Sequence, residues 1–132
     1  MSDLRNTIRS NTIGKKSKFA SELVDVGEDK VEVRQPSVKT RSILMKKSRD
    51  VKSSKIEVGE VSAEDVLQSI DYGKMQVLAV IYCTFVPDTE ERIFTESDYE
   101  ALINQPAGGF VDDISTVAMD LMNTKPEEDA KN

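Results

Sequence analysis

The stretch VLAVIYC, residues 77–83, is the longest apolar run in the chain and decides how the flanking sequence is interpreted. A short run that is apolar on all sides suits either a buried strand or the centre of a buried helix, and its β-branched residues are compatible with a strand. Upstream, however, apolar residues recur at helical spacing, and Ser62 with Asp65 resembles a capping box. We therefore predict a central buried helix that starts near Ser62 and ends before Pro87, with Gly73 bending or dividing it.

Two more helices are predicted after this one. In TESDYEALIN, residues 95–104, Thr95 and Asp98 have the spacing of a helix cap, and Phe94 before them is placed to pack on Tyr99 as a hydrophobic staple. The last predicted helix spans residues 110–123, where apolar residues recur every three to four positions.

The stretch QPAGG, residues 105–109, separates these two helices. Pro106 is expected to end the first helix, and Gly108 and Gly109 to turn the chain, one of them with a positive φ. Asp112 and Asp113 then complement the positive N-terminus of the next helix.

The N-terminal side is predicted to hold a β-hairpin and a short basic helix. Val31 and Val33 alternate with charged residues after Gly27, which indicates two short extended runs around VGED, residues 26–29. Pro36 stops the second run, and SVKTRSILMKKSRD, residues 37–50, has helical spacing.

Together these elements predict a mainly α fold. A small helical C-terminal domain at 61–123 is preceded by the hairpin, the short basic helix and a linker at 18–60. Residues 1–17 are polar and basic and show no periodicity, so we predict a disordered N-terminal arm. Residues 124–132 form a polar tail.

Charge is divided unevenly along the chain. Residues 1–60 hold 14 basic against 9 acidic side chains, and residues 61–132 hold 4 against 15. Such a division suggests two surfaces for different partners, or one half of a chain that packs on the opposite half of a neighbour. A simpler interpretation is a basic flexible arm beside an acidic soluble domain. The sequence contains no secretory signal and no run long enough for a membrane helix, and its single cysteine fits a reducing cytosol.

The residue types that carry catalysis are sparse. The chain has no histidine, and Cys83 lies in the most apolar segment, where a thiol is usually inert packing. The adjacent carboxylates Asp112 and Asp113 would point about 100° apart on a helix, which makes a poor acid–base pair. We predict no enzyme activity, no catalytic or metal-binding residues and no cofactor.

The basic N-terminal half leaves a nucleic-acid-binding regulator as an alternative. VEVRQPSVKTRSIL, residues 31–44, has the strand-then-helix order of ribbon-type DNA binders. Against this, its strand offers few base-reading side chains and no aromatic residues lie among the charges, so nucleic acid is the weaker prediction.

Two segments carry a family resemblance. VEVRQPSVKTRSILM (31–45) and FTESDYEALINQPAGGFVDDISTVAMDLM (94–122), in this order, resemble the tail assembly chaperones of long-tailed, siphovirus-type bacteriophages. The similarity covers about residues 18–123, and QPAGGFVDDI (105–114) is its best motif. The long basic N-terminal arm has no counterpart that we can match.

The resemblance implies a non-enzymatic function in the bacterial host cytoplasm. A tail assembly chaperone binds the tape measure protein and keeps it soluble, recruits tail tube subunits, and is absent from the mature virion. A frameshifted longer form of the chaperone and self-association are further implied partners, whereas a minor structural tail protein would stay in the particle. The residues predicted to bind a partner are Phe110, Val111, Ile114, Val117, Leu121, Arg34 and Arg41. For Phe110 and Val111 two roles stay open, core packing or a docking edge.

Overall fold

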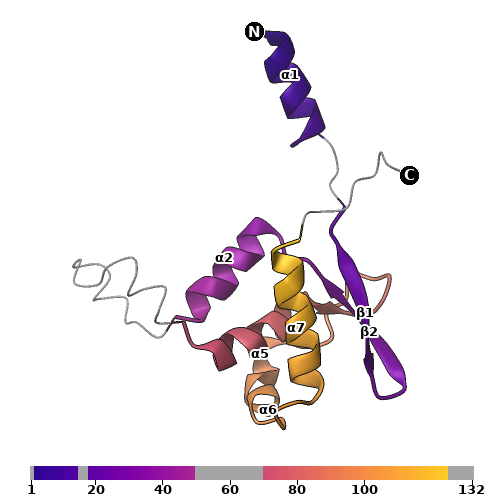
Figure 1. Ribbon diagram of the computed structural model, residues 1–132, viewed down its shortest axis with the longest axis vertical. Coiled ribbons are helices and arrows are strands. Elements are labelled where there is room, and N and C mark those ends of the chain that lie inside the picture. Colours follow the sequence, from indigo (N-terminus) through magenta and orange to yellow (C-terminus); the bar gives the residue numbers. More distant parts are fainter. Residues whose placement is uncertain (1, 15–17, 50–69, 125–132) are drawn as a thin grey trace, which may run out of the picture.

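Helices dominate the computed structural model of the chain, and a small antiparallel sheet packs beside them (Figure 1). The structure describes residues 2–14, 18–49 and 70–124. Its elements, labelled as in Figure 1, are α1 (Ser2–Asn11), β1 (Ser21–Val26), β2 (Asp29–Arg34), α2 (Val38–Lys47), α5 (Tyr72–Cys83), β3 (Thr84–Phe85), the 3₁₀ turn η1 (Glu96–Asp98), α6 (Tyr99–Ile103) and α7 (Phe110–Met122). The mainly α fold with a hairpin is thus confirmed, whereas the linker and the start of the domain predicted at residue 61 lie outside the described residues.

The hairpin forms where the alternation predicts it. β1 and β2 pair antiparallel in a register that places Val26 opposite Asp29, which leaves a two-residue turn. Gly27, the first residue of that turn, has a φ of +64°, a conformation that glycine adopts without steric cost. Val31 and Val33 on β2 are buried and face the helices.

A third strand was not predicted. Thr84 and Phe85 form β3, which pairs antiparallel with β2 through Val33 and Glu32 respectively. The prediction that the central helix would run on towards Pro87 is therefore wrong, because α5 ends at Cys83 and the next two residues pair with the sheet. β-Branched and aromatic residues favour this extended conformation once a partner strand is present.

The apolar run at 77–83 forms the second half of α5, as predicted. Asp71 caps the helix, its Oδ1 accepting from the backbone nitrogen of Lys74 at 3.1 Å, and Gly73 lies in the first turn. The predicted cap at Ser62 lies outside the described residues. α5 packs against α2, α6 and α7, so it lies at the centre of the helices.

One hydrophobic core joins the hairpin to the helices. Ile81 and Ile114, on α5 and α7, are almost completely buried beside Val33 of β2 and Leu44 of α2. The buried apolar residues are Ala20, Val31, Val33, Leu44, Val77, Leu78, Ala79, Val80, Ile81, Cys83, Leu102, Val111, Ile114, Ala118 and Leu121.

The last helix has the predicted bounds to within one residue, whereas the short basic helix, predicted over residues 37–50, ends three residues earlier, at Lys47. Ser37 caps α2, its Oγ accepting from the backbone nitrogen of Thr40 at 3.1 Å. In α7 the residues at core positions are buried, which confirms an amphipathic helix over 110–122. The predicted helix 95–104 is shorter: a 3₁₀ turn precedes α6, and the backbone nitrogen of Thr95 donates to Asp98 Oδ2 at 2.8 Å.

The turn before α7 also follows the prediction. Gly108 has a φ of +85°, and its backbone nitrogen donates to Asp112 Oδ2 at 2.5 Å. Gly109 is the residue before the helix, in extended conformation. The ring of Phe110 stacks on that of Phe94, with centroids 6.2 Å apart, so this aromatic pair ties the helix start to the segment before η1.

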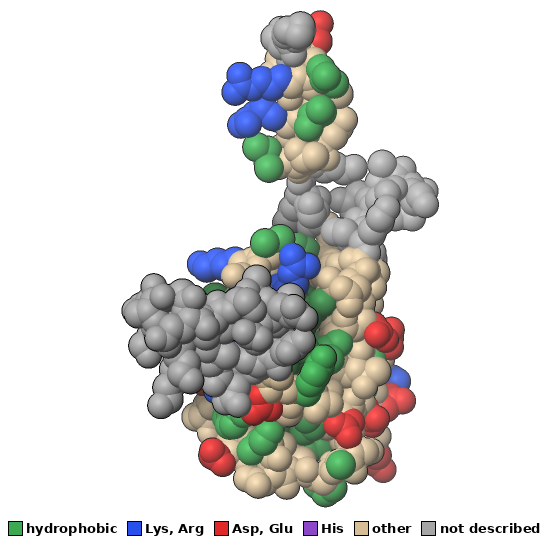
Figure 2. Space-filling view, turned by 60° about the vertical axis from the view of Figure 1, so that its left-hand side comes forward, with side chains coloured by type: hydrophobic (Ala, Val, Ile, Leu, Met, Phe, Trp, Pro, Cys, Tyr) green, Lys and Arg blue, Asp and Glu red, His purple; other side chains and the backbone are tan. Residues whose placement is uncertain are grey.

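The N-terminal arm differs from the prediction of disorder, because residues Ser2–Asn11 form helix α1. Asp3 in its first turn and Arg9 in its last turn complement the helix dipole. Leu4 and Ile8, one turn apart, are exposed on one side of α1, and Figure 2 shows basic side chains on the opposite side. α1 projects away from the other helices and the sheet in Figure 1.

Candidate interaction surface

The predicted partner-binding residues of α7 lie largely within the core of the chain itself. Ile114 has no exposed surface, and Val111 and Leu121 are each 8% exposed. Phe110 and Val117 are partly buried against the same core. A partner would reach the three buried side chains only after α7 had moved, and a binding role for these five residues stays a prediction.

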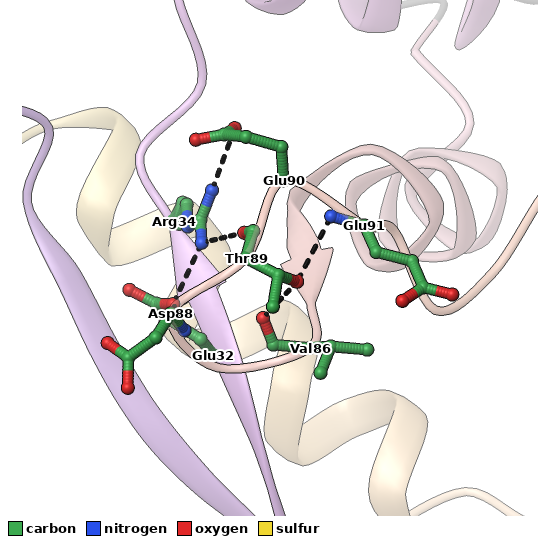
Figure 3. Close-up of polar contacts among 7 residues, drawn as sticks. All are labelled: Glu32, Arg34, Val86, Asp88, Thr89, Glu90 and Glu91. Atoms are coloured by element: carbon green, nitrogen blue, oxygen red, sulfur yellow. Dashed lines mark hydrogen bonds and ion pairs between the residues drawn. The ribbon is translucent and has the colours of Figure 1, made fainter.

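Arg34 is held within the chain rather than presented to a partner (Figure 3). Its guanidinium donates to Glu32 Oε1 at 3.0 Å, to Glu90 Oε2 at 3.1 Å and to the carbonyl oxygen of Thr89. The same group lies 4.3 Å from the centre of the Phe85 ring. Arg34 therefore ties β2 to the loop that follows β3.

The loop from Val86 to Glu91 is closed by its own hydrogen bonds. Thr89 Oγ1 donates to the carbonyl oxygen of Val86 at 2.8 Å and accepts from the backbone nitrogen of Glu91 at 3.1 Å (Figure 3). Asp88 has a φ of +64°, and its backbone nitrogen donates to Glu32 Oε1 at 3.1 Å. The hydrogen bond from Arg34, followed by the one from Asp88, lowers the pKa of the Glu32 carboxyl against the opposing effect of burial.

A series of cations and aromatic rings continues from Arg34 across the surface. The Arg92 guanidinium lies 5.9 Å from the centre of the Phe85 ring and 5.2 Å from that of Tyr82. The Lys47 ammonium is 5.6 Å from the centre of the same Tyr82 ring and pairs with Glu96. Hydrogen bonds from Lys47 and then Tyr82 lower the pKa of the exposed Glu96 carboxyl. The rings of Phe85 and Tyr82 are thus each in contact with cationic side chains of the same chain.

Among the described residues, an apolar groove of about 430 Å³ opens at the start of α2. Phe19 and Val38 line it and are 47% and 75% exposed, and Met122 contributes from the end of α7. We call it the Phe19–Val38 groove. Arg41, one of the predicted site residues, also lines it and is exposed, so the structure brings Arg41 to this groove and Arg34 to the neighbouring loop.

Gln35 organises one wall of the Phe19–Val38 groove. This side chain is 9% exposed, and its Oε1 accepts from the backbone nitrogen of Ala20 at 3.3 Å. Its Nε2 donates to the carbonyl oxygen of Leu121 at 3.0 Å and to that of Thr124. One buried amide thus joins the chain before β1 to the chain after α7, two segments about a hundred positions apart.

Sequence reasoning missed Phe19, Gln35, Val38 and Met122 as parts of one surface. They come from three segments far apart in the sequence, so no periodicity or spacing within the chain brings them together. The only signal was local: Val38 is an apolar residue in the exposed first turn of a short basic helix.

The described part of the chain offers little for catalysis or metal binding. Burial raises the pKa of the Cys83 thiol to about 12, so this thiol stays protonated and unreactive at neutral pH. No group of three or more histidine, cysteine, aspartate or glutamate side chains gathers there in a geometry suited to a metal ion. Nor does any helix of residues 2–14, 18–49 or 70–124 have the length and apolar character needed to cross a membrane.

Comparison with known proteins gives one clear result. No protein-family model matches the chain, and no curated protein is recognisably similar to it in sequence. Its fold is similar to that of the bacteriophage HK97 tail assembly chaperone. The match has a TM-score of 0.50 and covers 93% of this chain and 100% of that chain, at 18% sequence identity.

At this identity the two chains share a fold, and the resemblance seen in the sequence is confirmed at that level. The chain has a fold like that of a phage tail chaperone. The shared region spans the hairpin as well as the helices, because almost the whole chain is covered. The neighbour's role as a chaperone is non-enzymatic.

Proposed function

We propose that this protein is a tail assembly chaperone of a long-tailed bacteriophage. It binds the tape measure protein, keeps this long and partly apolar protein soluble in the host cytoplasm, and recruits tail tube subunits to it. It then leaves before the virion is complete. A longer frameshifted form of the chain and further copies of the chain are partners in the same process.

The observation that carries this proposal is the fold similarity to the HK97 tail assembly chaperone over 93% of the chain. It is supported by the order of the sequence segments 31–45 and 94–122, which resemble that family independently of the coordinates. Two similarities of different kinds therefore lead to one function.

The Phe19–Val38 groove is a suitable place for an apolar helix of the tape measure protein. Helix-in-groove recognition places apolar side chains, spaced one turn apart, into a hydrophobic depression. Phe19 and Val38 are large apolar side chains that remain about half or more exposed, and Met122 adds an adaptable apolar wall. Exposed apolar side chains that line one depression are typical of a docking surface.

The test is capture of a co-expressed tape measure fragment. The chain is expressed with a tagged apolar helical fragment of the tape measure protein encoded beside it, and both the soluble amount and the co-purified amount of fragment are measured. We expect the chain to raise both. Val38→Glu places a charge in the groove and should lower capture about tenfold, the cost of roughly 1.4 kcal/mol at a central interface residue.

A matched control carries the same change elsewhere. Leu23 is also an exposed apolar residue, at 54%, but lies on β1 outside the residues that line the groove. Leu23→Glu should capture the fragment as the unchanged chain does. The chaperone function would be contradicted if the fragment were as soluble without the unchanged chain as with it and never co-purified with it. Equal losses of capture in both variants would contradict the groove as the binding site.

The two alternatives give different results in simple assays. A structural tail protein would be found in purified virions, from which a chaperone is absent. A nucleic-acid-binding regulator would retain DNA, with an affinity that falls steeply as salt rises. The structure engages Arg34 and Lys47, two of the basic side chains of the N-terminal half, in ion pairs with Glu90 and Glu96 of the C-terminal half.

A further inference from the structure

Helix α1 carries apolar side chains that its own chain leaves uncovered. Leu4 and Ile8 are 66% and 52% exposed, and every residue from 3 to 14 is exposed. These two side chains, one turn apart, form one apolar side of the helix. A helix of ten residues is marginal in water unless an apolar side packs on something. Helix α1 therefore lacks, within one chain, the contact that stabilises helices of this length.

The basic side chains of α1 also lack carboxylate partners. Arg5 and Arg9 are exposed, and within the described ranges neither forms an ion pair. Arg5 directly follows Leu4, and successive residues of a helix are about 100° apart around the axis, so Arg5 flanks the apolar side. A surface that fits α1 is therefore an apolar depression with carboxylates at its edge.

A second groove of the molecule combines these two properties. It lies between α5, α6 and the turn before α7, and its volume is about 180 Å³. This is below the roughly 300–1,000 Å³ of small-molecule sites and suits one or two aliphatic side chains. We call it the Ile103–Ala107 groove. Its apolar lining consists of Val77, Leu102, Ile103, Pro106, Ala107 and Val111.

Unpaired carboxylates lie at the edge of this groove. Gly73 lines it, and a Cβ added there would be 3.5 Å from Asp71 Oδ1 and 3.7 Å from Ile103 Cδ1, so Asp71 is beside the apolar lining. Burial, followed by the charges of Asp71 and Glu100, raises the pKa of the Tyr99 hydroxyl, which places both carboxylates near one ring. Both are exposed, and in the described part of the chain neither pairs with a cation.

Charge distinguishes this groove from the Phe19–Val38 groove as a site for α1. Asp112 lines the Ile103–Ala107 groove and no Lys or Arg does, whereas Arg41 lines the Phe19–Val38 groove and no carboxylate does. A helix with two arginines is attracted to the first groove and repelled by the second. Figure 1 shows α1 and α6 at opposite ends of the molecule, so α1 does not occupy the Ile103–Ala107 groove of its own chain.

We propose that α1 of one copy docks in the Ile103–Ala107 groove of a second copy. Leu4 and Ile8 pack on the apolar lining, and Arg5 is directed to the carboxylates at the groove edge. Each chain then offers a helix at one end and a groove at the other, so copies join head to tail into a closed ring or an open filament. The inference deepens the proposed function, in which further copies of the chain are partners, and rests on that function for its biological role.

Two variants, each blocked on one side of the contact, provide the test. Leu4→Glu places a charge on the apolar side of α1, and Ala107→Arg places a bulky cation at an exposed residue of the groove. The controls carry the same new side chains elsewhere. Ser10→Glu lies on another side of α1, and Thr116→Arg is an exposed residue of α7 that does not line the groove.

The association of each purified full chain is measured by sedimentation velocity over a range of protein concentrations. Circular dichroism checks folding, and Ile8→Glu replaces Leu4→Glu should that variant unfold. We expect the unchanged chain to associate and each blocked variant to do so at least about tenfold more weakly, as for a central interface residue. The two controls should associate nearly as the unchanged chain does.

A mixture of the two blocked variants gives the sharpest result. The Leu4→Glu chain keeps an intact groove and the Ala107→Arg chain keeps an intact α1, so exactly one contact between them remains possible. We expect the mixture to form a 1:1 complex that grows no further, although each variant alone stays monomeric. A symmetric contact between two copies of α1 would give no such complex.

Four results would overturn the proposal: an unchanged chain that is monomeric at every concentration, a mixture that stays monomeric, controls that weaken association as much as the blocked variants, or association lost in Leu4→Glu but kept in Ala107→Arg. Failure of the chaperone function is read separately. Leu4→Glu leaves the Phe19–Val38 groove unchanged, so this variant should still capture the tape measure fragment, whether or not copies of the chain associate through α1.

Discussion

Replacing Ile81 by alanine tests the assignment of α5 as the centre of the core. Ile81 is 1% exposed and packs in the cluster that joins α5, α7, α2 and the hairpin. The change removes three carbon groups, worth about 0.8 kcal/mol each in transfer free energy, so about 2.4 kcal/mol is lost before any cavity forms. Adding the cavity that the surrounding helices cannot fill brings the expected loss in the free energy of unfolding to about 3–4 kcal/mol.

The measurement is urea unfolding followed by circular dichroism, with Ile13→Ala as the matched control. Ile13 is 74% exposed, so the same chemical change should cost less than about 0.5 kcal/mol there. A loss of 3–4 kcal/mol is a large part of the 5–15 kcal/mol that holds a typical domain folded. If the two variants unfolded at the same urea concentration with the same slope, Ile81 would not be in the core and the arrangement of helices around α5 would be wrong.

Three other perturbations follow from the structure. Gly108→Val should lower the free energy of unfolding by about 1–3 kcal/mol, because the φ of Gly108 is +85°. Gly73→Ala, in the first turn of α5 where a Cβ meets only ordinary contacts, should be neutral or stabilising, and thermal melting of the two variants tests this difference. Phe110→Ala removes a ring that stacks on Phe94 in a partly buried site, so it should lower the free energy of unfolding by about 2–4 kcal/mol. If the variant were equally stable but no longer captured the tape measure fragment, Phe110 would instead be a docking residue. The pKa of Glu32 lies below its ordinary 4.5, so its carboxylate stabilises the fold above that pH, and this stabilisation is lost as the pH falls through the lowered value. Glu32→Gln should therefore flatten the dependence of the free energy of unfolding on pH in this acidic range, with Glu22→Gln on β1 as the control. An unchanged profile would show that Arg34 does not stabilise this carboxylate.

The elements that sequence predicted well are those whose signals are local. The Gly27 turn, the short helix that follows Pro36 and the apolar periodicity of α7 are each specified by residues close by in the sequence, and all three are present. β3 has no such signal. Its two residues continue an apolar helix in sequence, and only pairing with β2, about fifty positions away, makes them a strand.

The arm at residues 1–17 shows the limit of arguing from composition. Its polar residues favour disorder, yet Leu4 and Ile8 are spaced by one turn and opposite charges occupy the two ends of the segment. These features are sufficient for a short helix in the structure. The prediction of disorder rested on polar composition, and an isolated helix of this length is marginal in water, so two apolar residues are a weak signal.

The candidate surface could be predicted only in part. Arg41 was selected from its charge, and it does line the groove. Phe110 and its neighbours on α7 were selected from their apolar periodicity, but the same periodicity marks core packing, and the structure uses Val111, Ile114 and Leu121 in that way. A groove assembled from the residue before β1, the start of α2 and the end of α7 depends on tertiary contacts, which periodicity does not encode.

The bond network of Gln35 has a practical consequence for anyone who labels or fuses this protein. Because one amide holds the entry to β1 and the exit from α7 together, a tag joined directly at Ala20 or Thr124 starts beside the Phe19–Val38 groove and competes for space there. The turn at Gly27 and Glu28 lies at the far end of the hairpin, where a Cβ added to the glycine meets no atom within 4 Å (Figure 1). An affinity peptide or a fluorophore inserted at this turn would leave the groove accessible, and binding data from such a fusion would report on the groove rather than on the tag.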